Sequence, residues 1–140
     1  MKNMLKQAIS VEDMRRHVAQ LTSGFPPDAD VRISRVRELH QANVLKDDYG
    51  NVLELWLPPV RSEVSYAVAL HEIGHIKGRC QKSRDEMVRE RGAWQWARDN
   101  ALVWTPEMER RAAEALAWIG NRAERGECPA CGGTGKKPTQ

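Results

Sequence analysis

The chain has 140 residues, of which 41% are hydrophobic and 29% charged, and its net charge at pH 7 is +3. This length and composition predict one globular domain with a modest core and argue against a wholly disordered chain. The small positive excess is typical of a solubilising surface and does not by itself favour nucleic-acid binding. No apolar run is long enough to span a membrane and the N-terminus lacks a secretory signal, so we expect a cytoplasmic protein without a membrane partner.

The first half of the chain predicts one helix followed by strands. Apolar residues recur at helical spacing over residues 11–23, directly after a Ser10–Asp13 pair that is typical of a capping box. Alternation of apolar and polar residues then predicts a strand from about residue 31. A further hairpin is predicted over residues 42–57, around a turn-forming cluster of Asp, Gly and Asn.

The second half of the chain predicts three helices. The first covers about residues 63–76 and is apolar nearly all round, which is typical of a buried helix. The next is predicted over residues 84–103, opened by a capping box of Ser83 and Glu86, and the last over residues 106–123. Together the elements predict an α+β fold in which about four helices pack on a small antiparallel sheet.

The buried helix carries the segment H-E-I-G-H, in which His71 and His75 are four residues apart. On an α-helix this spacing puts two imidazoles on one face, where both can bind the same Zn²⁺. Glu72 lies one position on, where its carboxylate can take a proton from a zinc-bound water. The alternative is a pair of core histidines that are hydrogen-bonded to carbonyl groups.

A catalytic zinc site usually has three protein ligands, and no histidine follows His75 in the chain. The next predicted helix offers carboxylates. Glu90 lies at the centre of its apolar stripe and is the predicted third ligand; an ion pair with an arginine is the alternative explanation for a carboxylate there. Glu86 flanks the stripe and is either a second candidate ligand or a residue that orients a ligand histidine.

These two segments, His71–His75 and Glu90–Ala97, resemble the ImmA/IrrE family of zinc metallopeptidase-like proteins. The resemblance covers about residues 50–106. It implies a compact zincin-like fold, an association with phages or mobile elements, and, for some members, cleavage or inactivation of a transcriptional repressor. The implied metal ligands and catalytic carboxylate are His71, His75, Glu90 and Glu72.

One position departs from the family pattern. Trp94 stands where the family often has Asn, and this change removes a potential hydrogen bond to the ligand shell. Trp94, Trp96 and Trp104 cluster on or beside the proposed ligand helix, and we expect them to pack in the core.

The predicted function is zinc-dependent hydrolysis of peptide bonds in a protein or peptide substrate, such as a regulator, with Glu72 activating the water. Tyr66 and His40 are candidates to stabilise the oxyanion, although Tyr66 also fits a core position. The alternative function is a non-catalytic interaction or adaptor module stapled by zinc. A closed structural site would need a fourth ligand, for which Glu86 and Cys80 are the nearby candidates.

The composition changes near residue 126, which predicts a domain over residues 1–126 and a flexible tail over residues 127–140. The tail contains Cys128 and Cys131 in a C-x-x-C-x-G-x-G pattern that looks like one repeat of the DnaJ cysteine-rich domain. Two cysteines supply half of a tetrahedral zinc site, so a partner or a second copy would have to complete it; the alternative is a tail without metal. A nucleic-acid adaptor would depend on this pair, and no recognisable DNA-binding motif supports that function.

Overall fold

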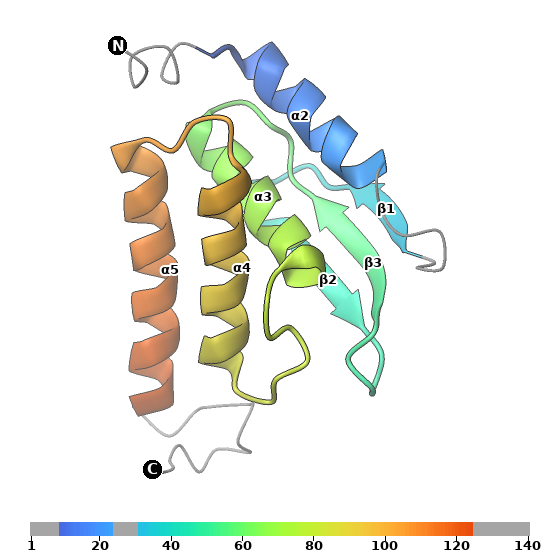
Figure 1. The fold of residues 1–140 in the computed structure, drawn as a ribbon, viewed down its shortest axis with the longest axis vertical. Helices are drawn as coiled ribbons and strands as arrows, with labels where there is room; N and C mark the ends of the chain where they lie inside the picture. Colours follow the sequence, from blue (N-terminus) through green and yellow to red (C-terminus); the bar gives the residue numbers. More distant parts are fainter. Residues whose placement is uncertain (1–8, 24–30, 125–140) are drawn as a thin grey trace.

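The computed structural model describes residues 9–23 and 31–124, and the described part forms an α+β fold (Figure 1). In chain order the elements are α2 (Val11–Ser23), β1 (Arg32–Arg35), the 3₁₀ turn η1 (Leu39–Gln41), β2 (Asn43–Lys46), β3 (Val52–Leu57), α3 (Glu63–Lys77), α4 (Glu86–Asn100) and α5 (Pro106–Glu124). The predicted helices and the predicted hairpin are therefore present. None of the described helices is long and apolar enough to cross a membrane.

The sheet has three strands in the order β1-β3-β2. β2 and β3 form the predicted antiparallel hairpin, but β1 runs parallel to β3, with Ile33 opposite Leu55. The prediction of a wholly antiparallel sheet is therefore wrong in this pair. The physical reason is that the chain reverses direction at η1 and again in the hairpin, so the third strand returns in the direction of the first and inserts between the other two.

α3 is the centre of the fold. It packs against α2, α4, α5 and two strands, and residues 65–75 are all buried. Its first turn is closed by Ser62, whose side chain accepts a hydrogen bond from the backbone N–H of Ser65. Because the helix has no face toward solvent over these turns, every polar side chain on it must find its partner inside the protein.

α4 begins two residues later than the sequence predicted. Asp85 is its N-cap and accepts a hydrogen bond from the backbone N–H of Met87 at 2.9 Å, whereas the Ser83 hydroxyl accepts from the N–H of Asp85. The aspartate is the stronger competitor for the cap because its charged carboxylate also faces the positive end of the helix dipole. By contrast, the predicted capping box of Ser10 and Asp13 on α2 is confirmed.

Three glycines allow α3 and α4 to approach closely; we call Gly74, Gly78 and Gly92 the glycine seam. A Cβ atom on Gly74 would collide with the backbone of Ala93, and one on Gly92 would collide with the carbonyl oxygen of Arg79. No side chain separates the two helices along this line. The close approach brings the side chains of α4 directly over the polar residues of α3.

Candidate metal centre

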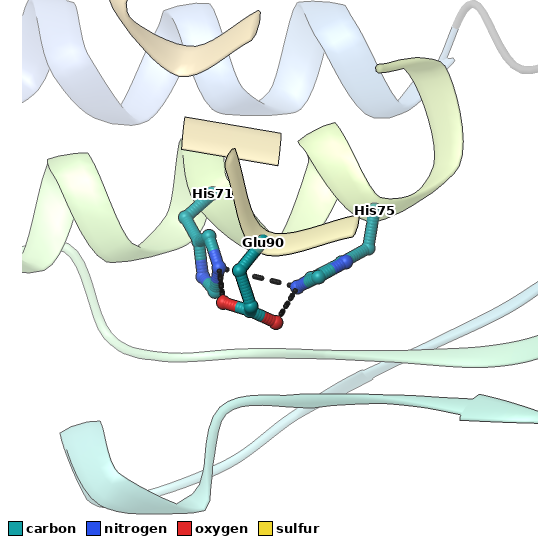
Figure 2. A group of neighbouring side chains, drawn as sticks. All are labelled: His71, His75 and Glu90. Atoms are coloured by element: carbon teal, nitrogen blue, oxygen red, sulfur yellow. Dashed lines mark hydrogen bonds and ion pairs between the residues drawn. The ribbon is translucent and has the colours of Figure 1, made fainter. Parts of the chain in front are cut away.

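Three side chains converge between α3 and α4 (Figure 2). Nε2 of His71 lies 2.8 Å from Oε1 of Glu90, and Nε2 of His75 lies 2.9 Å from Oε2 of the same carboxylate. The two Nε2 atoms are 3.1 Å apart. The structure thus brings together the three residues that the sequence predicted as ligands, and we call this group the candidate metal centre.

Gln81 orients the ring of His75. Its side-chain amide nitrogen donates to the carbonyl oxygens of Arg79 and Arg89, at 2.9 and 2.8 Å. The amide oxygen therefore faces Nδ1 of His75, at 2.9 Å. Because an amide oxygen only accepts, Nδ1 carries the proton, and Nε2 presents a lone pair to the candidate metal centre.

The ring of His71 is oriented by two neighbours. Oε2 of Glu72 lies 3.2 Å from Nδ1, so this nitrogen also carries a proton, and in the neutral ring Nε2 presents a lone pair. Trp94 stacks on the ring, with centroids 4.2 Å apart and planes inclined by 17°. Trp94 therefore supports the ring of His71 by stacking. Within the described part of the chain, the buried indole N–H of Trp94 has no hydrogen-bond partner.

Three acceptor groups therefore face one another, and in the neutral tautomers no N–H lies between them. A buried arrangement of this kind is stable only when a cation, either added protons or a metal ion, occupies the centre. The pKa of His71 reflects this demand: burial alone would lower it, but the hydrogen bonds and charges of Glu72 and Glu90 raise it to about 9. Burial pushes the pKa of Glu90 upward, yet the two histidines outweigh that effect and hold it well below its ordinary range.

The donor set fits Zn²⁺. Zinc binds His nitrogen and carboxylate oxygen at about 2.0–2.2 Å, so donors of a tetrahedral site lie about 3.3 Å apart, a few tenths of an ångström wider than here. Two histidines and one glutamate are typical of catalytic zinc sites, which keep the fourth position open. Among the described residues, no further His, Cys, Asp or Glu belongs to the group; the exposed Cys80 and the half-buried Glu86 lie outside it.

The open side of the centre is a pocket of about 190 Å³. It is lined by His75 and Glu90 together with Asn43, Val44, Lys46 and Arg89. The sequence predicted none of the last four, because they come from a strand and a helix whose contact depends on the tertiary fold. Gln81 was also missed, since a polar loop residue carries no periodic signal. The glycines of the seam, Gly74, Gly78 and Gly92, were the visible signals of close helix packing.

The remaining predicted residues lie elsewhere. The hydroxyl of Tyr66 contacts Nδ1 of His17 at 2.7 Å and accepts from the backbone N–H of Leu102 at 3.0 Å. Tyr66 is fully buried and occupies the core position that the sequence allowed for it. His40 is exposed in η1. The tail over residues 127–140, with its cysteines at 128 and 131, lies outside the described residues.

Comparison with known proteins finds no matching family model, no matching curated protein and no matching solved structure. The resemblance to the ImmA/IrrE family therefore stays a prediction that depends on the two short segments of α3 and α4.

Proposed function

We propose that the protein is a zinc-dependent metallopeptidase-like enzyme that hydrolyses peptide bonds in a protein or peptide substrate. One observation carries this proposal. Two imidazole nitrogens and one carboxylate meet within 3.1 Å, and the outer partner of each ring is an acceptor, so each neutral ring would turn a lone pair inward. A structural pair of core histidines would instead be expected to match donors with acceptors.

His71, His75 and Glu90 would hold the zinc ion, which supplies Lewis acidity and lowers the pKa of a bound water toward about 7. Glu72 accepts the proton of the attacking water and delivers it to the leaving amine. One oxygen of its carboxylate lies against Nδ1 of His71, so Glu72 also orients a ligand. The two tasks use the two carboxylate oxygens.

The neighbouring strand supports a peptide as the substrate. Within the described sheet β2 pairs with β3 alone, so its other edge is free, and three of its residues, Asn43, Val44 and Lys46, line the pocket of the candidate metal centre. An extended chain adds to such an edge through main-chain hydrogen bonds, which would lay the scissile bond across the pocket.

The test is cleavage of a complex peptide mixture by the zinc-loaded full chain, read as new peptide termini by mass spectrometry. Glu72→Gln is the matched variant, because its amide oxygen still accepts from Nδ1 of His71 but cannot take up a proton. We expect equal zinc content and cleavage at least about a hundredfold slower in the variant. Equal cleavage rates would refute the role of Glu72. Zinc bound in both chains with no cleavage by either would favour the alternative, a non-catalytic zinc-stapled interaction module.

A further inference from the structure

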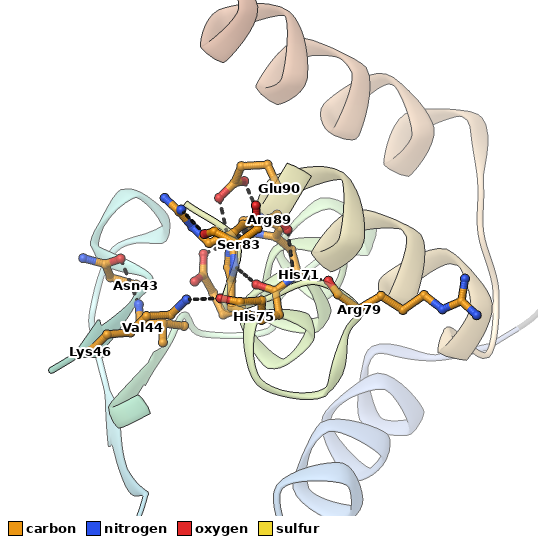
Figure 3. A network of polar contacts seen from close by, with 11 residues as sticks. Asn43, Val44, Lys46, His71, His75, Arg79, Ser83, Arg89 and Glu90 are labelled. Atoms are coloured by element: carbon orange, nitrogen blue, oxygen red, sulfur yellow. Dashed lines mark hydrogen bonds and ion pairs between the residues drawn. The ribbon is translucent and has the colours of Figure 1, made fainter. Parts of the chain in front are cut away.

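Two cations border the open side of the candidate metal centre. Lys46 projects from the edge strand β2 and Arg89 from α4, and both line the pocket that reaches His75 and Glu90 (Figure 3). Among the described residues neither side chain is within ion-pair distance of a carboxylate. The pocket therefore presents two positive charges next to the position where a substrate would bind.

The contacts that these cations do make are with neutral groups. Nζ of Lys46 donates to the backbone carbonyl of Gln81 at 3.2 Å, and Nη1 of Arg89 donates to that of Ser83 at 2.6 Å. Each bond uses one of several N–H donors and neutralises no charge. Anchoring a loop to two carbonyl oxygens would need only a neutral donor, so the loop contacts leave the two charges unexplained.

The surroundings make this charge pair costly. Burial lowers the pKa of Lys46, the nearby charge of Arg89 lowers it further, and Glu90 raises it. A divalent metal on Glu90 would use that carboxylate and leave the two cations with less compensation than before. Like charges that are half-buried together are stabilised when a bound ligand brings the opposite charge.

We infer that Lys46 and Arg89 form a carboxylate-binding subsite beside the metal centre, which selects peptides with a carboxylate next to the bond that is cleaved. The inference rests on the proposed function, because it names the substrate class of that same site. An Asp or Glu side chain and a free C-terminus both present the oxygen pair that a guanidinium and an ammonium group can bind.

Two small probes can test the subsite without a known substrate. The monohydroxamate of succinic acid and the hydroxamate of succinamide both chelate an active-site metal and differ only in a terminal carboxylate or amide. Binding to the Co²⁺-loaded full chain is read from the visible spectrum of the metal. We expect the carboxylate probe to bind roughly tenfold tighter or more, which corresponds to one charge-assisted hydrogen bond.

The variants Lys46→Met and Arg89→Met should each remove most of this advantage and change the affinity of the amide probe by less than about twofold. Lys82→Met is the matched control, because Lys82 lies in the same loop region, binds the side chain of Asn51 and does not line the pocket. Wild-type protein in 1 M salt gives a reading that needs no variant: the preference for the carboxylate should shrink.

Equal affinity of the wild type for both probes overturns the subsite and leaves the proposed function standing. Loss of binding of both probes in Lys46→Met and Arg89→Met overturns it too, because the residues would then act by holding the loop. Failure of both probes to bind the loaded wild type removes the open metal position and the inference with it. Two peptide hydroxamates, one with an internal Glu and an amidated end and one with a free C-terminus and no acidic side chain, then distinguish the two sources of carboxylate.

Discussion

Two histidine clusters touch α3, and they satisfy their polar atoms in opposite ways. In the cluster of His17, Tyr66 and Leu102, the tyrosine hydroxyl accepts from the backbone N–H of Leu102 and shares a hydrogen bond with Nδ1 of His17. A hydroxyl can donate as well as accept, so it can match either neutral tautomer of the imidazole. In the candidate metal centre of His71, His75 and Glu90, the outer partners of both rings are acceptors, so in the neutral tautomers three acceptors meet and the donors point outward.

The titration behaviour follows the same division. Burial lowers the pKa of His17 and raises that of Tyr66 to about 12, as expected for neutral groups in a closed network. Burial acts to lower the pKa of His71, but the carboxylates of Glu72 and Glu90 outweigh burial and raise this pKa to about 9. A buried histidine therefore indicates a metal site when its neighbours leave acceptors facing one another, and indicates a core position when they do not.

The largest expected effect is loss of the metal from Glu90→Ala. We expect one zinc per chain in the wild type and almost none in this variant, measured by elemental analysis in a background in which Cys128 and Cys131 are both Ser. Zinc at a thousand times its dissociation constant should add about 4 kcal/mol to the free energy of unfolding, and the variant should lose this gain. Glu86→Ala is the control from the same helix and should keep its zinc. If Glu86→Ala lost its zinc and Glu90→Ala kept it, Glu86 and not Glu90 would be the third ligand.

Gly74→Ala tests whether the glycine seam is what holds the centre together. The added methyl group meets the backbone of Ala93, which cannot move as a flexible side chain does, so α4 must shift away from α3. We expect unfolding to become easier by about 3 kcal/mol, with weaker zinc binding. Gly120→Ala is the control, since the nearest atom there is a flexible methionine methyl at 3.5 Å, and stability should stay equal or rise. Unchanged zinc affinity in Gly74→Ala would mean that the glycine seam does not hold the metal ligands in place.

In the metal-free protein the two clusters should respond to pH with opposite sign. The pKa of His71, about 9, lies above the ordinary 6.5. Its contribution to the free energy of unfolding is therefore fully present below pH 6.5 and is lost as pH rises through 9. The pKa of His17 lies below 6.5, so its contribution is present above that pH and lost on acidification. Urea unfolding in the presence of a chelator, repeated across pH, should show that the free energy of unfolding falls at alkaline pH by on the order of 3 kcal/mol.

Variants assign these two responses. His71→Asn should abolish the alkaline loss and His17→Asn the acid one, and saturating zinc should remove the alkaline loss by replacing the proton on His71. If the free energy of unfolding of His71→Asn still fell at alkaline pH, the titrating proton would belong to another group, and the contrast between the two histidine clusters would not hold.

The sequence predicted the parts of the fold that depend on local physics. α3 could be found because it is apolar all round and Ser62 caps it, and Glu90 could be chosen because it interrupts the apolar stripe of α4. The direction of β1 could not, since it depends on which strand inserts between two others. The start of α4 was missed because Ser83 and Asp85 compete for the same cap, and only the folded backbone decides between them.

The same limit applies within the site. The ligands were predictable because helical spacing fixes them, whereas Gln81 acts from a loop with no period and reaches His75 only through its bonds to two carbonyls. Lys46 and Arg89 line one pocket because β2 and α4 both pack against α3, an arrangement that no local pattern encodes.

Gln81→Met removes the amide oxygen that faces Nδ1 of His75 on the outer side of the candidate metal centre. Without the amide oxygen, Nδ1 of His75 no longer has a partner that fixes the ring, and zinc affinity should fall about 10- to 100-fold, as is usual for residues that orient metal ligands. Gln95→Met is the control, because that side chain is exposed and bonds only Asp99 and Arg98 on the same helix. Competition with a chromophoric chelator measures both affinities, and equal values in the two variants would remove Gln81 from the site.

Tyr66→Phe has the smallest expected effect and tests the other cluster. The change leaves the N–H of Leu102 and Nδ1 of His17 without their common partner, so unfolding should become easier by about 1–3 kcal/mol while zinc content stays at one per chain. Tyr49→Phe, at a residue that is 84% exposed, should change neither quantity. If Tyr66→Phe slowed hydrolysis while stability held, the hydroxyl would belong to the oxyanion site, and the division between a closed core network and an open metal centre would no longer stand. A loss of stability alone, with zinc retained, would mean that α3 presents one histidine cluster to the core and a chemically separate one to the substrate.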